Sequence, residues 1–358
     1  MKTLTSIARQ ASVCFALLTF AAAHYAWAQE GGGTDKPDQN RVGTVGAVEL
    51  LIPVTARYVS LGATTTGGLP NMNGLEALYA NPAGLTHNTG STALFSRMNY
   101  LVDDIGVSYF GFGQRIGNDN HLALTVSSWN LGDIPRQSES APEKSEVTFN
   151  VAFVSVGFTY ARVLTDRISA GGTIKVVNES IDDVSASGVV FDAGMTYVVG
   201  ETGLRFGVAV KNIGNELKYE GTGLTRRVQL PTQAGNASVN AVNIESEAME
   251  YPALLNFGMA YSRQLAGSAS LTILGNFRSN SFEQDQFSSG VELGLRDILF
   301  VRGGYEYVGN SEVSVWKGYT FGAGLNVDIS GTQVSIDYAM APTDYFNDVQ
   351  FLTVSATL

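Results

Sequence analysis

The sequence predicts an all-β protein: a transmembrane antiparallel β-barrel of about 14 strands with an N-terminal hatch segment. Three observations support this fold class. From Ser91 to the C-terminus, apolar residues alternate with glycine, polar or charged residues, as in strands with two different faces. Glycine accounts for 40 of the 358 residues, and charged residues for only 15%. The connections between the alternating segments are short and long in turn, as in outer-membrane barrels.

Residues 1–28 are typical of an export signal. Lys2 and Arg9 provide the charged start, residues 11–23 are apolar, and Ala26-Trp27-Ala28 matches a cleavage site. We therefore predict cleavage near Ala28, export, and a location in the cell outer membrane. Residues 29–42 are polar and glycine-containing, and we expect a flexible N-terminal tether.

Residues 43–90 are predicted to form the hatch. Their apolar runs contain helix breakers, so we expect short helices or irregular structure rather than strands. The segment ends with Asn81-Pro82-Ala83-Gly84-Leu85, whose local chemistry is that of a tight turn. Pro82 fixes its own φ and disfavours helix at Asn81, and Gly84 can adopt a positive φ. An ordinary turn is the alternative to a functional motif here.

Alternation then predicts the strands one after another. In residues 321–329, for example, every odd position is apolar and every even position is Gly, Asn or Asp. A soluble, half-buried sheet produces the same pattern, so a secreted β-sandwich is the alternative. The predicted strands are 91–101, 104–114, 120–129, 147–163, 168–181, 188–199, 203–212, 252–264, 268–278, 286–296, 298–307, 319–329, 331–340 and 349–358.

The lengths of the connections favour the barrel over the sandwich. Apart from the first connection, at 102–103, short turns alternate with longer loops, and a sandwich has no reason to sort its loops in this way. We expect the long loops on the outer side of the membrane. The longer connections are 130–146, 181–187, 213–251, 279–285, 308–318 and 341–348.

Composition excludes several functional classes. The formal net charge of −11 argues against nucleic acid as a partner, because phosphate binding requires a basic surface. The only cysteine, Cys14, lies in the predicted signal, so the exported chain would have no disulfide and no cysteine nucleophile. The three histidines lack metal-ligand spacing, and no catalytic motif is present. We expect no enzymatic activity, no cofactor and no metal.

Two sets of residues are candidates for function. Charged residues on the predicted lumen face are interpreted as an interior polar network, with a substrate path as the alternative. They are Arg205, Lys211, Arg278, Arg302 and Glu306. The long connection 213–251 is a candidate lid or partner-binding loop, because structureless connections of this length are usually functional or disordered. Its candidate residues are Glu216, Tyr219, Arg226, Arg227, Glu245 and Glu247.

Several short motifs resemble those of a known family. Ala56-Arg57, Gly62-Ala63, Leu75 to Tyr79 and Asn81 to Leu85 resemble the N-terminal signature of the PorV/PorQ outer-membrane proteins. The chain's ending, at residues 322–325 and 336–339, resembles the closing hairpin of that family. Those proteins are similar to the FadL long-chain fatty-acid transporters and share their 14-strand barrel. The resemblance assigns the hatch motif to Arg57, Gly62, Asn81, Pro82, Ala83, Gly84 and Leu85.

The resemblance also implies a position and a function for the hatch. It would fold inward at the periplasmic end, with Asn81 and Pro82 fixing it where it joins the first strand. In the PorV branch the barrel acts with the type IX secretion system as a cargo-binding or shuttle component. Its partners would be outer-membrane lipid, secreted cargo proteins and secretion components. The alternative is a FadL-like channel for hydrophobic small molecules, which predicts an apolar pocket beneath the outer loops; a purely structural barrel is the third possibility.

Overall fold

The computed structural model describes residues 44–102, 105–136, 147–228, 240–265, 267–308 and 315–358. The predicted export signal and the predicted tether lie outside these ranges. No helix in the described ranges is long and apolar enough to cross a membrane.

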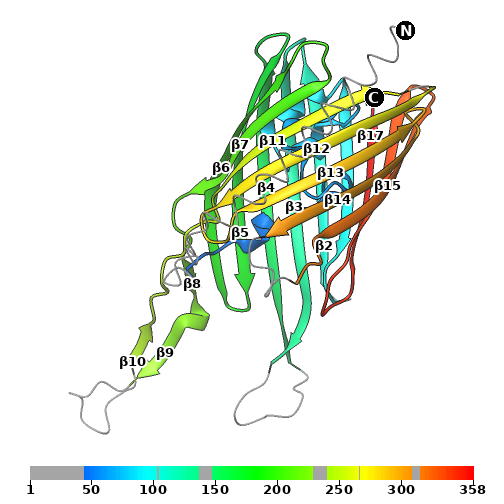
Figure 1. Cartoon of the computed structure of the whole chain (residues 1–358). Coiled ribbons are helices and arrows are strands. Elements are labelled where there is room, and N and C mark those ends of the chain that lie inside the picture. Colours follow the sequence, from blue (N-terminus) through cyan, green and yellow to red (C-terminus); the bar gives the residue numbers. More distant parts are fainter. Residues whose placement is uncertain (1–43, 103–104, 137–146, 229–239, 266, 309–314) are drawn as a thin grey trace, which may run out of the picture. The chain divides into compact units, whose positions relative to one another are not determined.

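The described chain forms a closed, antiparallel barrel of 14 strands, which confirms the predicted fold class (Figure 1). Each strand pairs with its neighbour in the chain, and β1 pairs with β17 to close the barrel. The barrel strands are β1 (Ser91–Asn99), β2 (Gly106–Ile116), β3 (Asn120–Pro135), β4 (Thr148–Val163), β5 (Ile168–Ile181), β6 (Val184–Val198), β7 (Leu204–Gly214), β11 (Leu254–Gln264), β12 (Ala269–Asn280), β13 (Gln286–Leu295), β14 (Leu299–Val308), β15 (Tyr319–Ile329), β16 (Thr332–Ala341) and β17 (Val349–Thr357).

One predicted long connection is wrong. The loop expected at 181–187 is a two-residue turn, because Ile181 pairs directly with Val184 at the start of β6. Asp182, in this turn, has a φ of 54°. Ser185 and Ser187 suggest a loop by composition, but they alternate with inward-facing residues such as the buried Ala186. The strand therefore begins earlier than its polar composition indicates.

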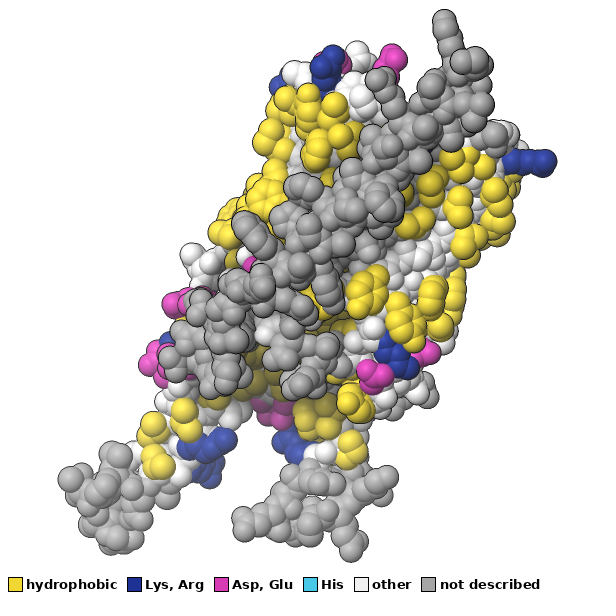
Figure 2. Space-filling view, viewed as in Figure 1, with side chains coloured by type: hydrophobic (Ala, Val, Ile, Leu, Met, Phe, Trp, Pro, Cys, Tyr) yellow, Lys and Arg dark blue, Asp and Glu magenta, His cyan; other side chains and the backbone are white. Residues whose placement is uncertain are grey.

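The outer face of the barrel is apolar. On β13, for example, Phe287, Val291, Leu293 and Leu295 point outward and are exposed, with Phe287 at 58%, whereas Glu292 between them is buried. Figure 2 shows hydrophobic side chains over much of the visible outer face of the described chain. Only lipid makes such an exposed apolar surface favourable on all sides of a barrel.

A small hairpin extends from the connection between β7 and β11. β8 (Tyr219–Gly221) continues the barrel sheet by pairing with β6, and η5 (Thr222–Leu224) follows it. β9 (Thr225–Val228) and β10 (Asn240–Asn243) then pair only with each other. Figure 1 shows this hairpin projecting from the barrel on the side of the long loops, which we call the long-loop end; the opposite side is the short-turn end.

Residues 44–90, which we call the plug, lie inside the barrel. The plug has no strand, and its five short helical turns pack against different parts of the wall. α2 contacts β14 to β17, η3 contacts β7, β11 and β12, α3 contacts β1 and β2, and η4 contacts β3 to β6. The turns are η2 (Val48–Leu51), α2 (Ala56–Ser60), η3 (Thr65–Gly67), α3 (Gly74–Ala77) and η4 (Pro82–His87).

The plug runs from one end of the barrel to the other. At the long-loop end, Gly46 N donates to Glu250 O at 2.9 Å, and Glu250 N donates to Thr44 O at 3.0 Å. At the short-turn end, Arg115 N donates to Gly90 O at 3.1 Å, just before β1 begins. The segment therefore extends along the barrel and is not confined to one end, as the expected hatch at the periplasmic end would be. Leu50 and Ala47 are buried against Val177 and Leu217, so the first apolar turn is held near the long loops.

Glycines on the inner face of the wall allow the plug to approach the strands closely. At eight of them, on β2, β5, β6, β7, β11, β13, β14 and β15, an added Cβ would lie 2.0–2.7 Å from a plug atom, much closer than side-chain atoms can approach. Six of them form three directly paired couples across neighbouring strands. We call these eight glycines the glycine band: Gly113, Gly171, Gly194, Gly207, Gly258, Gly290, Gly304 and Gly322.

Candidate functional site

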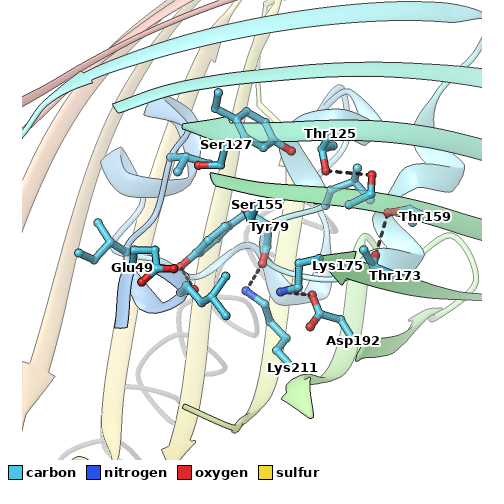
Figure 3. Close-up of a pocket in the computed structure, with 16 residues that line it drawn as sticks. Glu49, Tyr79, Thr125, Ser127, Ser155, Thr159, Thr173, Lys175, Asp192 and Lys211 are labelled. Atoms are coloured by element: carbon cyan, nitrogen blue, oxygen red, sulfur yellow. Dashed lines mark hydrogen bonds and ion pairs between the residues drawn. The ribbon is translucent and has the colours of Figure 1, made fainter. Parts of the chain in front are cut away.

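A cavity of about 70 Å³ lies between the plug and the inner faces of β2 to β7 (Figure 3). Its plug side is mostly apolar, whereas its wall side carries hydroxyl and charged groups. The pocket is therefore of mixed character, and the expectation of an apolar pocket is wrong for the wall. The plug contributes Glu49, Leu50, Ile52, Val54, Leu78 and Tyr79, and the wall Tyr109, Thr125, Ser127, Ser155, Gly157, Thr159, Thr173, Lys175, Asp192 and Lys211.

A β-bulge creates the charged corner of the cavity. The pairing of β6 with β7 shifts after Phe191, so Lys211 and Asn212 together oppose Asp192. Asn212 has a φ of 59°, and both bulge residues are buried. Lys175 Nζ lies 2.8 Å from Asp192 Oδ2 and donates to Asn212 Oδ1 at 2.7 Å. A bulge thus turns two successive side chains inward, which regular alternation does not allow.

Lys211 connects the wall to the plug. Its Nζ donates to the backbone oxygen of Tyr79 and lies 3.8 Å from the centre of the Tyr79 ring. Among the described residues, no carboxylate oxygen lies within 4.0 Å of this ammonium group. The cation is stabilised by a carbonyl and an aromatic face, both supplied by the plug.

Arg302, another predicted lumen residue, belongs to a buried cluster of five charged side chains. Arg57 of the plug donates to both oxygens of Glu292 at 3.0 and 3.1 Å, and Arg302 Nε donates to Glu292 Oε2 at 2.6 Å. Arg302 also donates to Asp337, and Arg57 lies 3.5 Å from Glu76. Burial, and then the charge of Asp337, raises the pKa of Glu76 to about 8. With Glu76 protonated, two guanidinium groups balance two carboxylates.

The remaining lumen residues also point to the plug. Arg278 Nη2 donates to the Tyr58 hydroxyl at 2.9 Å, and Glu306 interacts electrostatically with the same arginine. Arg205 Nη1 lies 3.0 Å from His87 Nε2. Every predicted lumen cation therefore contacts the plug directly or through one carboxylate. Sequence reasoning missed the acidic partners, although Glu292 and Asp337 stand between apolar residues in alternating strands and this pattern could have identified them.

Asn81 attaches the plug to the wall. Its Nδ2 donates to Thr66 O at 3.0 Å, Met195 O at 3.0 Å and Val208 O at 3.3 Å. Its Oδ1 accepts from Ala83 N at 3.0 Å, the local bond expected of a turn. Met195 and Val208 belong to β6 and β7, so Asn81 does not fix the hatch where it joins the first strand, as the resemblance implied.

The other hatch-motif residues are packed inside. Pro82, Ala83 and Leu85 are buried in η4. Gly84 does not adopt the positive φ that glycine allows; its role is close packing, because an added Cβ would lie 2.4 Å from Ala77 Cβ. Gly62 does have a positive φ, of 63°, and it lies against β14.

The predicted partner-loop residues do not form one site. The Tyr219 hydroxyl donates to Glu179, Glu245 pairs with Lys218, and Arg226 donates to Gly223 O at 2.9 Å. Arg227, Glu216 and Glu247 are exposed. Within the described ranges, no group of three or more acidic, histidine or cysteine side chains is arranged to hold a metal ion.

Comparison with solved structures identifies proteins of the same fold. The CymD monoaromatic hydrocarbon channel matches with 12% identity and a TM-score of 0.53, over 86% of this chain and 97% of that one. The Pseudomonas putida toluene transporter TodX matches with 11% identity and a TM-score of 0.53, over 85% and 96%. A Pseudomonas aeruginosa FadL homologue matches with 12% identity and a TM-score of 0.53, over 85% and 98%.

Sequence comparisons add nothing to this likeness: no family model and no curated protein sequence matches the chain. At this level of identity, the structural matches show the fold alone. The chain therefore has a closed 14-strand barrel with an N-terminal helical segment, and its fold is similar to that of these three proteins.

Proposed function

We propose that this protein is an outer-membrane channel that takes up hydrophobic small molecules. The observation that carries the proposal is the cavity between plug and wall, whose plug side presents Leu50, Ile52, Val54 and Leu78. Apolar lining with a few polar groups is typical of small-molecule sites. Two proteins of similar fold, a monoaromatic hydrocarbon channel and a toluene transporter, act on the same class of ligand, which supports the proposal.

Ligand entry requires the plug to move. The cavity, at about 70 Å³, is well below the roughly 150 Å³ of an apolar cavity that binds benzene. The first plug residues supply much of the apolar lining and are joined to the long loops by the hydrogen bonds of Glu250. With the long loops outside the cell, as expected for outer-membrane barrels, a shift of residues 44–54 would widen the cavity toward the outside.

Uptake into vesicles tests the proposal. The purified protein is reconstituted, and entry of toluene or a fluorescent fatty acid is measured for the wild type, Ile52→Trp and Leu325→Trp. The first substitution fills the cavity, whereas the second adds the same side chain at an exposed position on the lipid face. We expect Ile52→Trp to lower uptake several-fold and Leu325→Trp to leave it unchanged. Wild-type vesicles no more permeable than protein-free vesicles would overturn the proposal.

The second candidate is the PorV-like role of cargo binding or shuttling with the type IX secretion system. The projecting β9–β10 hairpin favours it, since a two-stranded hairpin gains stability from a further strand or a partner surface. Arg226, Arg227, Val228 and Val242 are exposed on it.

Affinity capture from the native membrane tests this role. Arg226→Glu with Arg227→Glu is compared with Arg167→Glu, a charge reversal at the short-turn end. Loss of secretion components or exported cargo with the first variant, and their retention with the control, would support partner binding. The same proteins captured with all variants, or none with the wild type, would reject it.

A further inference from the structure

Two buried glutamates face each other where the plug meets the long-loop end. Glu49 lies in η2 with 7% of its surface exposed, and Glu179 lies near the end of β5 with 3% exposed. Leu50 and Val177, which lie close to them in the chain, are buried in one cluster with Tyr251, and the two carboxyl groups interact electrostatically. The Tyr219 hydroxyl of β8 already donates to Glu179. Three elements, the plug, the wall and the long connection after β7, therefore meet at one pair of acids.

The pair lacks the partners that two negative charges would need. Within the described chain, no Lys, Arg or His nitrogen lies within 4.0 Å of either carboxylate. Among the residues that the structure describes, neither buried Glu49 oxygen has a hydrogen-bond donor, and the buried Tyr251 hydroxyl beside the pair also lacks a partner. Two ionised carboxylates offer only acceptors, whereas one proton between them supplies the missing donor and removes one charge.

The groups that face the pair do not replace this proton. Tyr219 and Tyr251 are neutral phenols, and Tyr79 donates to Leu50 O at 3.1 Å. Lys175 and Lys211 line the same cavity, but the first pairs with Asp192 and the second binds Tyr79 (Figure 3).

We propose that Glu49 and Glu179 share one proton and form a latch that holds residues 44–54 of the plug in place beneath the long loops. The latch follows from the contact and burial of the two acids and does not depend on what passes through the barrel. Its role as a gate rests on the proposed function: Glu49, Leu50, Ile52 and Val54 line the cavity, so release of this segment widens the space for a hydrophobic ligand.

The latch has a defined pH dependence. Burial, and then the charge of Glu179, raises the pKa of Glu49 from an ordinary value of 4.5 to about 8. A carboxyl whose pKa is raised in the folded state stabilises the contact below its ordinary pKa. That stabilisation declines as the pH increases and is lost once the pH passes the raised value. The latch is therefore closed in acid and near neutral pH and weakened in mild alkali.

Spin labelling of the full-length protein in vesicles tests the latch. A label at Val48→Cys, which is 50% exposed next to Glu49, reports the mobility of η2 from about pH 6 to about pH 9, on either side of the raised pKa. A label at Thr86→Cys, in η4 of the same plug, is the control. We expect the Val48 label to become mobile with a midpoint near the pKa of Glu49, and the Thr86 label to remain unchanged.

Glu49→Gln provides the decisive comparison. Its amide donates to Glu179 at every pH, so we expect the Val48 label to stay immobile throughout the titration. Equal pH responses in the wild type and Glu49→Gln, or no response in the wild type, would overturn the latch. Hydrocarbon uptake is measured separately. A latch that responds to pH in a barrel that passes no hydrocarbon would leave the latch standing and reject the proposed function.

Discussion

The buried charges show how far individual residues can be interpreted from sequence. Arg57 and Arg302 were identified as important from the resemblance and from alternation, and both lie in the five-charge cluster. Their contact through Glu292 was not predictable, because 235 residues separate Arg57 from Glu292 and only the three-dimensional path of the plug brings them together. Sequence identified the polar interior, but it did not identify which charges pair.

A substitution at Arg302 tests how much stability is lost when this cluster is broken. Arg302→Met preserves the length of the side chain but leaves Asp337 without its arginine and Glu292 with only Arg57. Removing one partner of a buried ion pair costs about 3–5 kcal/mol, so we expect a large loss of stability in denaturant unfolding. Arg167→Met, at an exposed turn, is the matched control and should change little. Equal unfolding midpoints for the two variants would contradict this account of the cluster.

A substitution at Asn81 tests how the plug is attached to the wall. Asn81→Asp keeps the shape but replaces the Nδ2 donor with an oxygen that faces the carbonyls of Thr66, Met195 and Val208. Each buried group left without its partner costs about 1–3 kcal/mol, so we expect the plug to loosen. The measurement is the rate at which a protease cleaves within residues 44–90. We expect faster cleavage in Asn81→Asp, whereas Asn118→Asp, an identical change in an exposed turn, should leave the rate at the wild-type value. Cleavage at the wild-type rate in both variants would contradict the role of Asn81.

At the scale of elements, the strands were predictable and their irregularities were not. The predicted spans 168–181 and 319–329 coincide with β5 and β15, and in the second of them period-two alternation is uninterrupted. The bulge at Lys211 and Asn212 violates that period, so simple alternation placed only Lys211 inside. The glycine content was noticed as a sign of a barrel, but its structural reason, close approach of the plug, required the structure.

The glycine band gives a prediction at this scale. At Gly207 on β7, a Cβ would lie 2.0 Å from Thr66 O, a backbone atom that cannot rotate away. A Cβ added at Gly303 on β14 would have no atom of the described residues within 4 Å. Overpacking costs about 1–3 kcal/mol, so Gly207→Ala should lower the free energy of unfolding by this amount, and Gly303→Ala should not. Denaturant unfolding curves of Gly207→Ala that match those of the wild type would show that the plug can move away from the wall.

For the whole molecule, sequence predicted that the N-terminal segment is buried but not how it is routed. Apolar residues broken by glycine and proline require burial, yet they give no direction along the barrel. The structure supplies the direction: the plug starts beside Glu250 at the long-loop end and finishes beside Arg115 at the short-turn end. It is thus attached to the wall along its whole path, and only its first turn borders both the cavity and the long loops.

This path predicts an unusual pattern of accessibility in intact cells. Arg226→Cys, on the hairpin, should react with a membrane-impermeant thiol reagent if the long loops face outward. Val48→Cys lies in the plug, only 43 residues before the first barrel residue, Ser91, but it should react under the same conditions because it is exposed at the long-loop end. Arg167→Cys, at the short-turn end, should react only after the outer membrane is permeabilised. A Val48 cysteine that behaves like the Arg167 cysteine would place the start of the plug at the inner end. The latch between Glu49 and Glu179 would then not exist in the cell, since β5 ends at the long-loop side.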